Sequence, residues 1–204
     1  MTGHFGNWEL AGCALTGVYP INGISRRFRN PLIRRSILRL RRAFGEKVIF
    51  AGDGLEPMLA CLRRNECIAL LPDKRLRAAR ITVDFFGRRV CVPSSPALLS
   101  WRTGAPLLTG GALRIGETPR FQLVHGEPIR PDPTAPKGTE IRRLSQAWTT
   151  ALEQLIRQHP EQWIWTHNRF KHAPATARPQ PKSASTQTVD APLSLKAAPR
   201  VQPS

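Results

Sequence analysis

The spacing of apolar residues alternates along the chain between short strand-like runs and helical repeats, which predicts strands and helices in alternation. Residues 47–50, 67–71 and 121–125 are short apolar runs of the kind found in buried strands. Residues 56–64 and 139–159 instead place apolar side chains at helical spacing. Strands separated by helices predict an α/β fold, with a mostly parallel sheet flanked by helices.

Further elements follow from local signals. Residues 10–24 begin as an apolar helix and end as a strand, residues 83–87 form a strand that ends in a glycine turn, and residues 97–102 form a helix. Residues 103–113 predict a turn followed by another buried strand. The two remaining regions are a basic segment at 25–42 and the C-terminal end.

The basic segment has the pattern of an amphipathic helix that begins at Pro31. Its apolar residues lie partly on one face, and the other face is nearly all arginine. Two interpretations stay open. The helix is either a solvated basic helix or a surface for lipid phosphates or an acidic carrier protein, because the arginine fork binds phosphate in a two-pronged manner.

Composition narrows the choice of partners. The 204 residues carry a formal charge of +17 and a pI near 11.4, so an anionic partner is expected. No zinc-finger or RNA-binding signature accompanies the charge, which disfavours nucleic acid. No apolar run has the roughly 20 residues of a transmembrane helix. We expect a chain that is soluble or peripheral to a membrane, with one domain at residues 1–172 and a disordered basic tail at 173–204.

The first candidate for chemistry lies in Thr2–Leu10, where His4 and Glu9 stand five positions apart. A carboxylate that orients a neutral imidazole makes a general base, which can take a proton from a hydroxyl so that the oxygen attacks an acyl thioester. We expect Gly3 and Gly6 to let the backbone approach a substrate closely.

Asp73 is the second candidate, because it follows an apolar strand directly. A buried parallel strand delivers side chains at its carboxyl end, where ligands of α/β proteins bind. The alternative is an aspartate that caps a turn after Pro72. Lys74 favours the ionised carboxylate.

These residues carry a resemblance to a known family. The segment Gly-His-Phe-Gly-Asn-Trp-Glu at residues 3–9 is similar to the His-x4-Asp/Glu block of the lipid A biosynthesis lauroyl/myristoyl acyltransferases, within the lysophospholipid-acyltransferase-like superfamily. Five further blocks match in order: Arg29–Leu32, Leu70–Asp73, Val83–Gly87, Arg102–Pro106 and His159–Lys171.

The resemblance implies a glycerolipid-acyltransferase-like layered fold and a set of roles. His4 would be the general base and Glu9 would orient it, while Arg41, Asp73 and Asn7 would serve substrate binding. The donor would be an acyl carrier protein thioester, and the acceptor a hydroxyl of a lipid A precursor in lipopolysaccharide biosynthesis. The resemblance implies no metal or redox cofactor, and a location at the cytoplasmic face of the inner membrane.

The chain departs from the family pattern in two places. Asp73 is followed by lysine where the family has glutamine, and the family has a longer N-terminal region that includes a membrane-spanning helix. We therefore expect a chain that is N-terminally short relative to the family. Two alternatives stay open: acylation of another anionic or amino-acid-bearing lipid, or an inactive truncated fragment that acts only as a basic membrane-surface protein.

Overall fold

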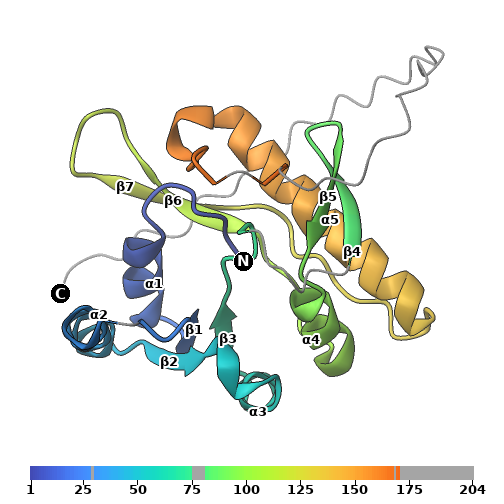
Figure 1. The fold of residues 1–204 in the computed structure, drawn as a ribbon, viewed down its shortest axis with the longest axis horizontal. Helices are drawn as coiled ribbons and strands as arrows, with labels where there is room; N and C mark the ends of the chain where they lie inside the picture. Colours follow the sequence, from blue (N-terminus) through green and yellow to red (C-terminus); the bar gives the residue numbers. More distant parts are fainter. Residues whose placement is uncertain (29, 75–80, 168, 171–204) are drawn as a thin grey trace.

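The computed structural model describes residues 1–28, 30–74, 81–167, 169 and 170. It is an α/β structure with a three-stranded parallel sheet, two antiparallel strand pairs and surrounding helices (Figure 1). The predicted tail at 173–204 lies outside the described residues. Among the residues described, no helix has the length and apolar character needed to cross a membrane.

The parallel sheet is built from the first third of the chain. Strand β1 (Ile21–Ser25) is central and pairs with β2 (Lys47–Phe50) on one side and β3 (Cys67–Ala69) on the other. Helices α2 (Pro31–Ala43) and α3 (Glu56–Arg63) connect these strands, as parallel pairing requires a crossover. The predicted alternation of strands and helices is confirmed here.

The rest of the sheet structure is antiparallel, so the expectation of a mostly parallel sheet holds only for residues 21–69. Strand β4 (Ile81–Phe85) pairs with β5 (Arg88–Val92), and β6 (Gly110–Arg114) pairs with β7 (Phe121–His125). Only two residues separate β4 from β5, which is too short for a crossover and sufficient for a hairpin. Both residues of that turn, Phe86 and Gly87, have positive φ, 51° and 70°, as a type I′ hairpin turn requires. We did not predict β5, whose arginines interrupt its apolar pattern.

The main core lies between the antiparallel strands and two helices, α4 (Ser95–Thr103) and α5 (Lys137–Gln158). Helix α5 packs along β4 and α4, and its predicted apolar face is buried there. Phe5 joins this core and is fully buried. A second, smaller core forms around α3 and β2.

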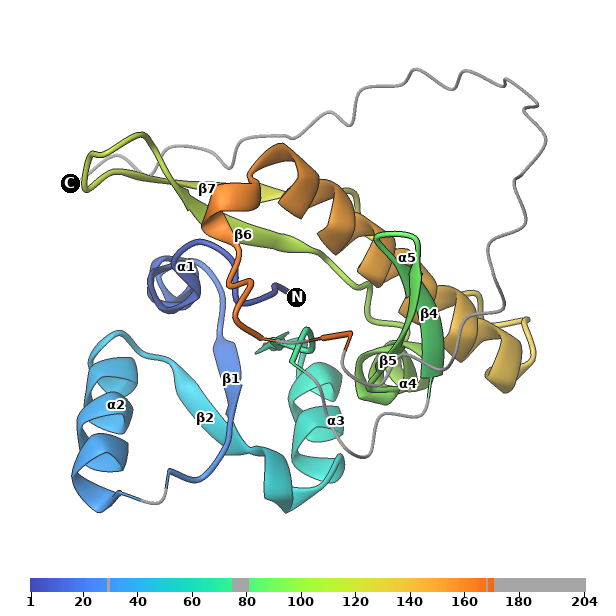
Figure 2. The ribbon, with the colours of Figure 1, turned by 45° about the horizontal axis from the view of Figure 1, so that its top comes forward.

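Helix α1 (Trp8–Thr16) contacts both β1 and β6, so it connects the parallel sheet to the antiparallel region. Helix α2 lies at the outer margin of the molecule, next to β2 and remote from α5 (Figures 1 and 2). Residues 70–74, after β3, and residues 162–167, after α5, lie next to the segment that precedes α1.

Candidate active site

The His-x4-Glu segment is held by three parts of the chain that are distant in sequence. Thr2 N donates to Leu70 O at 3.0 Å, just after β3. Gly6 N donates to Gln162 O at 2.8 Å, and Asn7 N donates to Ala112 O of β6 at 2.9 Å. The backbone on both sides of His4 is therefore fixed before any side chain is considered.

The two glycines of this segment permit close contacts within the protein. A Cβ on Gly3 would lie 2.9 Å from Asp73 Oδ2, and a Cβ on Gly6 would lie 2.1 Å from Ala112 O. Gly6 also has a φ of +56°, which favours glycine. The close approach that we expected toward a substrate is thus made, in this structure, toward Asp73 and β6.

Asp73 holds the imidazole of His4. His4 Nδ1 lies 2.7 Å from Asp73 Oδ1, and the backbone N–H of His4 donates to Asp73 Oδ2 at 2.7 Å. The Asp73 side chain is only 2 % exposed, and that of His4 is 15 % exposed. A buried carboxylate next to Nδ1 places the ring proton on Nδ1 and leaves the Nε2 lone pair available.

Two groups that follow α5 in the chain hold Asp73 in place. Trp163 Nε1 donates to Asp73 Oδ2 at 3.2 Å, and the Arg169 guanidinium donates to the Asp73 backbone carbonyl. Burial by itself raises the pKa of Asp73, but the hydrogen bonds from His4 and Trp163 and the interaction with the His4 charge outweigh it and hold the pKa below its usual value. Burial lowers the pKa of Arg169 to about 10, against the opposing effect of Asp73.

Besides Asp73, two aromatic side chains contact the His4 ring. Trp8 and His167 each meet it edge-on, with ring centroids 5.0 Å away. Burial, followed by the charges of Lys74 and His4, lowers the pKa of His167, so His167 is neutral at neutral pH. Among the described residues, the hydrogen bonds of the His4 ring involve Nδ1 alone. Nε2 is therefore the nitrogen that can accept a proton from a substrate.

Glu9 binds a different partner, Arg41 of α2. Arg41 Nε and Nη2 donate to the two Glu9 carboxylate oxygens at 3.1 and 2.6 Å, which is a bidentate pair. On its other side, Arg41 Nη1 lies 3.9 Å from Glu46 Oε1. Burial lowers the pKa of Arg41, but the hydrogen bond and charge of Glu9 outweigh this effect and raise it. Arg41 is thus a fixed cation between two carboxylates.

The predicted site residues consequently form two contacts in place of the predicted His4–Glu9 contact. His4 is oriented by Asp73, which we had placed in substrate binding, while Glu9 holds Arg41, also a predicted substrate-binding residue. Asn7 is the N-cap of α1, and its side chain accepts from Leu10 N at 3.0 Å. The catalytic and substrate-binding roles of these residues remain predictions.

No role was predicted from the sequence for Glu46, His167 or Trp163. A signal existed for Glu46, because an isolated glycine inside a strand indicates close approach of another group. Gly23 of β1 is such a glycine, and a Cβ there would lie 1.8 Å from Glu46 Oε1. His167 and Trp163 follow α5, and no spacing rule connects them to residue 4; their signal was the block His159–Lys171, which contains both and resembles the family.

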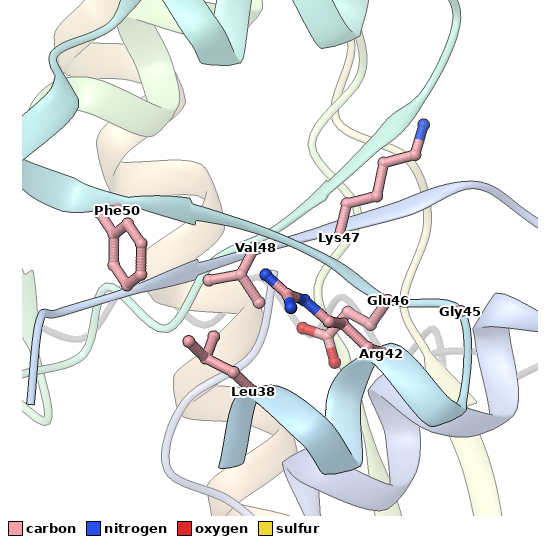
Figure 3. A pocket seen from close by; sticks show the side chains of 7 residues that line it. All are labelled: Leu38, Arg42, Gly45, Glu46, Lys47, Val48 and Phe50. Atoms are coloured by element: carbon pink, nitrogen blue, oxygen red, sulfur yellow. The ribbon is translucent and has the colours of Figure 1, made fainter. Parts of the chain in front are cut away.

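Glu46 also lines a pocket of about 350 Å³ between α2 and β2. Figure 3 shows Leu38 of α2 opposite Val48 of β2, with Arg42 and Lys47 as its cationic groups. The His4 and Asp73 side chains do not line this pocket, so it is separate from the His4–Asp73 pair.

Comparison with known proteins decides the family. The family model described as "Bacterial lipid A biosynthesis acyltransferase" matches residues 1–172, which include both His4 and Asp73. The chain belongs to this family. The resemblance seen in the sequence is thereby confirmed.

Relatives of this acyltransferase family member carry names that refer to different lipids. It is 27 % identical over 165 residues to a phosphatidylinositol mannoside acyltransferase of Mycobacterium tuberculosis, covering 78 % of this chain and 50 % of the relative. It is 24 % identical over 173 residues to the lipid A biosynthesis palmitoleoyltransferase of Escherichia coli, covering 84 % and 55 %. The chain spans about half the length of the curated relatives it matches.

Proposed function

We propose that this protein is an acyltransferase that moves a fatty acyl chain from an acyl carrier protein thioester to a hydroxyl of a lipid A precursor. The observation that carries the proposal is the His4–Asp73 pair, with His4 Nδ1 held at 2.7 Å and Nε2 available, inside the region that matches the family. We further propose the glycerolipid-acyltransferase-like layered fold and a location at the cytoplasmic face of the inner membrane.

In this mechanism His4 Nε2 takes the proton of the acceptor hydroxyl as its oxygen attacks the thioester carbonyl. A C–O bond forms, the C–S bond breaks, and the proton passes from His4 to the departing thiolate. Asp73 stabilises the imidazolium that exists between these two proton transfers. No covalent intermediate on the enzyme is required.

Glu9 and Arg41 have a supporting role in this proposal. The bidentate contact fixes the Arg41 guanidinium beside the first turn of α1, four residues after His4. Arg41 would then bind a phosphate of the substrate through Nη1, the guanidinium nitrogen that is not bonded to Glu9. The direct orientation of His4 by Glu9 is the competing prediction, and exchanging each acid separately distinguishes the two.

Acylation of another anionic lipid is a second candidate, because relatives named phosphatidylinositol mannoside acyltransferase match over most of this chain. The headgroup choice would depend on residues around Arg41 and on Lys74, the position at which the chain differs from the family pattern. The reaction and the His4–Asp73 pair would be the same.

The test measures transfer of a radiolabelled acyl chain from acyl carrier protein to each of three acceptors: a lipid A precursor, a phosphatidylinositol mannoside and a lysophospholipid. His4→Ala should reduce the rate by about 10²- to 10⁴-fold, the usual contribution of a general base. His125→Ala is the matched control, since His125 Nδ1 lies 3.0 Å from only a backbone carbonyl, that of Gly126, among the described residues. Equal rates for the His4 variant and this control, or no product from folded protein, would contradict the proposal.

A further inference from the structure

Helix α2 presents most of its large apolar residues to solvent instead of to the protein. None of its thirteen residues is buried. Three large apolar side chains of the helix and the one at its C-cap are between 49 and 73 % exposed. We call these four residues the α2 stripe: Leu32, Ile33, Leu40 and Phe44. At 100° per residue these positions fall on one side of the helix.

The side of α2 that faces the protein is partly polar. Arg41 lies there, with a side chain only 12 % exposed, in contact with Glu9 and Glu46. Ile37 and Leu38 are its half-buried neighbours. A surface helix usually turns its apolar face toward the protein, whereas most of the apolar face of α2 points away from it.

The charges of α2 are of one sign. The helix contains five arginines and no acidic residue, and Arg34, Arg35, Arg39 and Arg42 are exposed. Arg35 and Arg39 border the α2 stripe on the helical projection. An exposed apolar stripe next to a cationic face is typical of helices that lie in the interface of an anionic bilayer.

We infer that α2 docks the protein onto an anionic lipid bilayer, with the α2 stripe inserted at the headgroup boundary and the arginines on lipid phosphates. The arginines alone would suit an anionic leaflet or an acidic protein, but the exposed stripe beside them favours the bilayer, because its apolar side chains gain by entering the headgroup boundary. The docking itself stands on the geometry of α2 and does not require the proposed reaction.

Docking by α2 has a consequence for the active site, and this part rests on the proposed function. Arg41 connects α2 to Glu9 in the first turn of α1, and Trp8 of the same turn contacts the His4 ring. A bilayer under α2 would therefore place His4 close to the lipid interface. A lipid acceptor could then reach His4 without leaving the membrane.

The experiment is co-sedimentation of the full chain with vesicles of phosphatidylcholine alone or mixed with phosphatidylglycerol. Ile33→Gln/Leu40→Gln should weaken partitioning onto the mixed vesicles roughly tenfold or more, because it removes apolar area from the interface. Ile115→Gln/Leu108→Gln is the matched control, since Ile33 and Ile115 are 49 and 48 % exposed and Leu40 and Leu108 are 50 and 40 % exposed. This control should bind like the unchanged protein.

Added salt should weaken binding to the mixed vesicles, and vesicles of phosphatidylcholine alone should bind much less. Equal binding by the two double variants would overturn the inference, as would failure of the folded, unchanged protein to bind. A dimer that dissociates in Ile33→Gln/Leu40→Gln, without vesicle binding, would instead assign the stripe to self-association. Hydrogen exchange on the unchanged protein gives a second measurement: vesicles should protect α2 and leave the turn around Ile115 unaffected.

Acyl transfer to an acceptor in detergent micelles separates this inference from the proposed function. If docking alone is wrong, His4-dependent transfer in micelles persists while vesicle binding is absent. If the reaction alone is wrong, vesicle binding persists without transfer.

Discussion

Replacing Asp73 by asparagine should disable His4 through its tautomer while leaving its position unchanged. Asp73 Oδ2 accepts two hydrogen bonds, from His4 N at 2.7 Å and Trp163 Nε1 at 3.2 Å, whereas Oδ1 meets only His4 Nδ1 within the described part of the chain. An asparagine will therefore direct its carbonyl oxygen at the two fixed donors and its NH₂ group at Nδ1. Nδ1 must then accept a hydrogen bond from that NH₂ group, so the ring proton moves to Nε2. Nε2 no longer has the free lone pair that would take the proton of the substrate.

The expected loss follows from this change of tautomer. Neutralising the acid of a His–acid pair costs about 10³- to 10⁴-fold in rate, which corresponds to roughly 4 to 5.5 kcal/mol of transition-state stabilisation. Asp73→Asn keeps two of the three hydrogen bonds and reverses the third while removing the carboxylate charge, so the free energy of unfolding should fall by only about 1 to 3 kcal/mol. The catalytic effect should thus exceed the structural one.

The assay combines initial rates of acyl transfer with the ¹⁵N chemical shifts of His4, which distinguish the two tautomers. Glu9→Gln is the control, since it leaves the His4–Asp73 contact in place and should retain the Nδ1–H tautomer. An Asp73→Asn variant within tenfold of the unchanged rate would refute the reasoning. A Glu9→Gln variant that alone changes the His4 tautomer would return the orienting role to Glu9.

Two further predictions concern stability. Gly6 and Gly116 both have a φ of +56°, but an added Cβ would lie 2.1 Å from Ala112 O at Gly6 and would meet nothing within 4 Å at Gly116. In chemical denaturation, Gly6→Ala should therefore lower the free energy of unfolding by about 2 to 4 kcal/mol and Gly116→Ala by about 1 kcal/mol. Equal losses in the two variants would contradict the close contact at Gly6. The pKa of Asp73 is lowered by folding, so its ionised form contributes stability that is present above the unfolded pKa of about 3.9 and is lost as pH falls through the lower folded pKa. The unfolding free energy should accordingly become less sensitive to acid in Asp73→Asn, and an unchanged acid profile would argue against this assignment.

Much of the local structure could be predicted from the chain. Helical periodicity identified α5, and Pro31 marked the start of α2, where Asn30 provides the cap. An apolar run followed by an acid correctly predicted that Asp73 would lie just beyond a parallel strand. These features depend on side-chain periodicity and backbone preference within a few residues, so they can be read without tertiary information.

The pairing of the site residues could not be obtained in this way. Spacing favoured Glu9 as the partner of His4, because the two are close in sequence. In the folded chain, hydrogen bonds from Gly6 and Asn7 to distant segments and the entry into α1 direct the two side chains to different partners. Which carboxylate meets an imidazole depends on backbone direction, which only the assembled elements define.

The orientation of α2 is a second feature of this kind. Its amphipathic pattern was evident from the sequence, and pattern alone predicts an apolar face turned inward. The carboxylates of Glu9 and Glu46 hold Arg41 on the inner side, and the stripe is left exposed. The chain's residues therefore determine its helices, its basic charge and its candidate groups. The tertiary structure decides which of them meet, because charge pairs and close backbone contacts form between segments far apart in sequence.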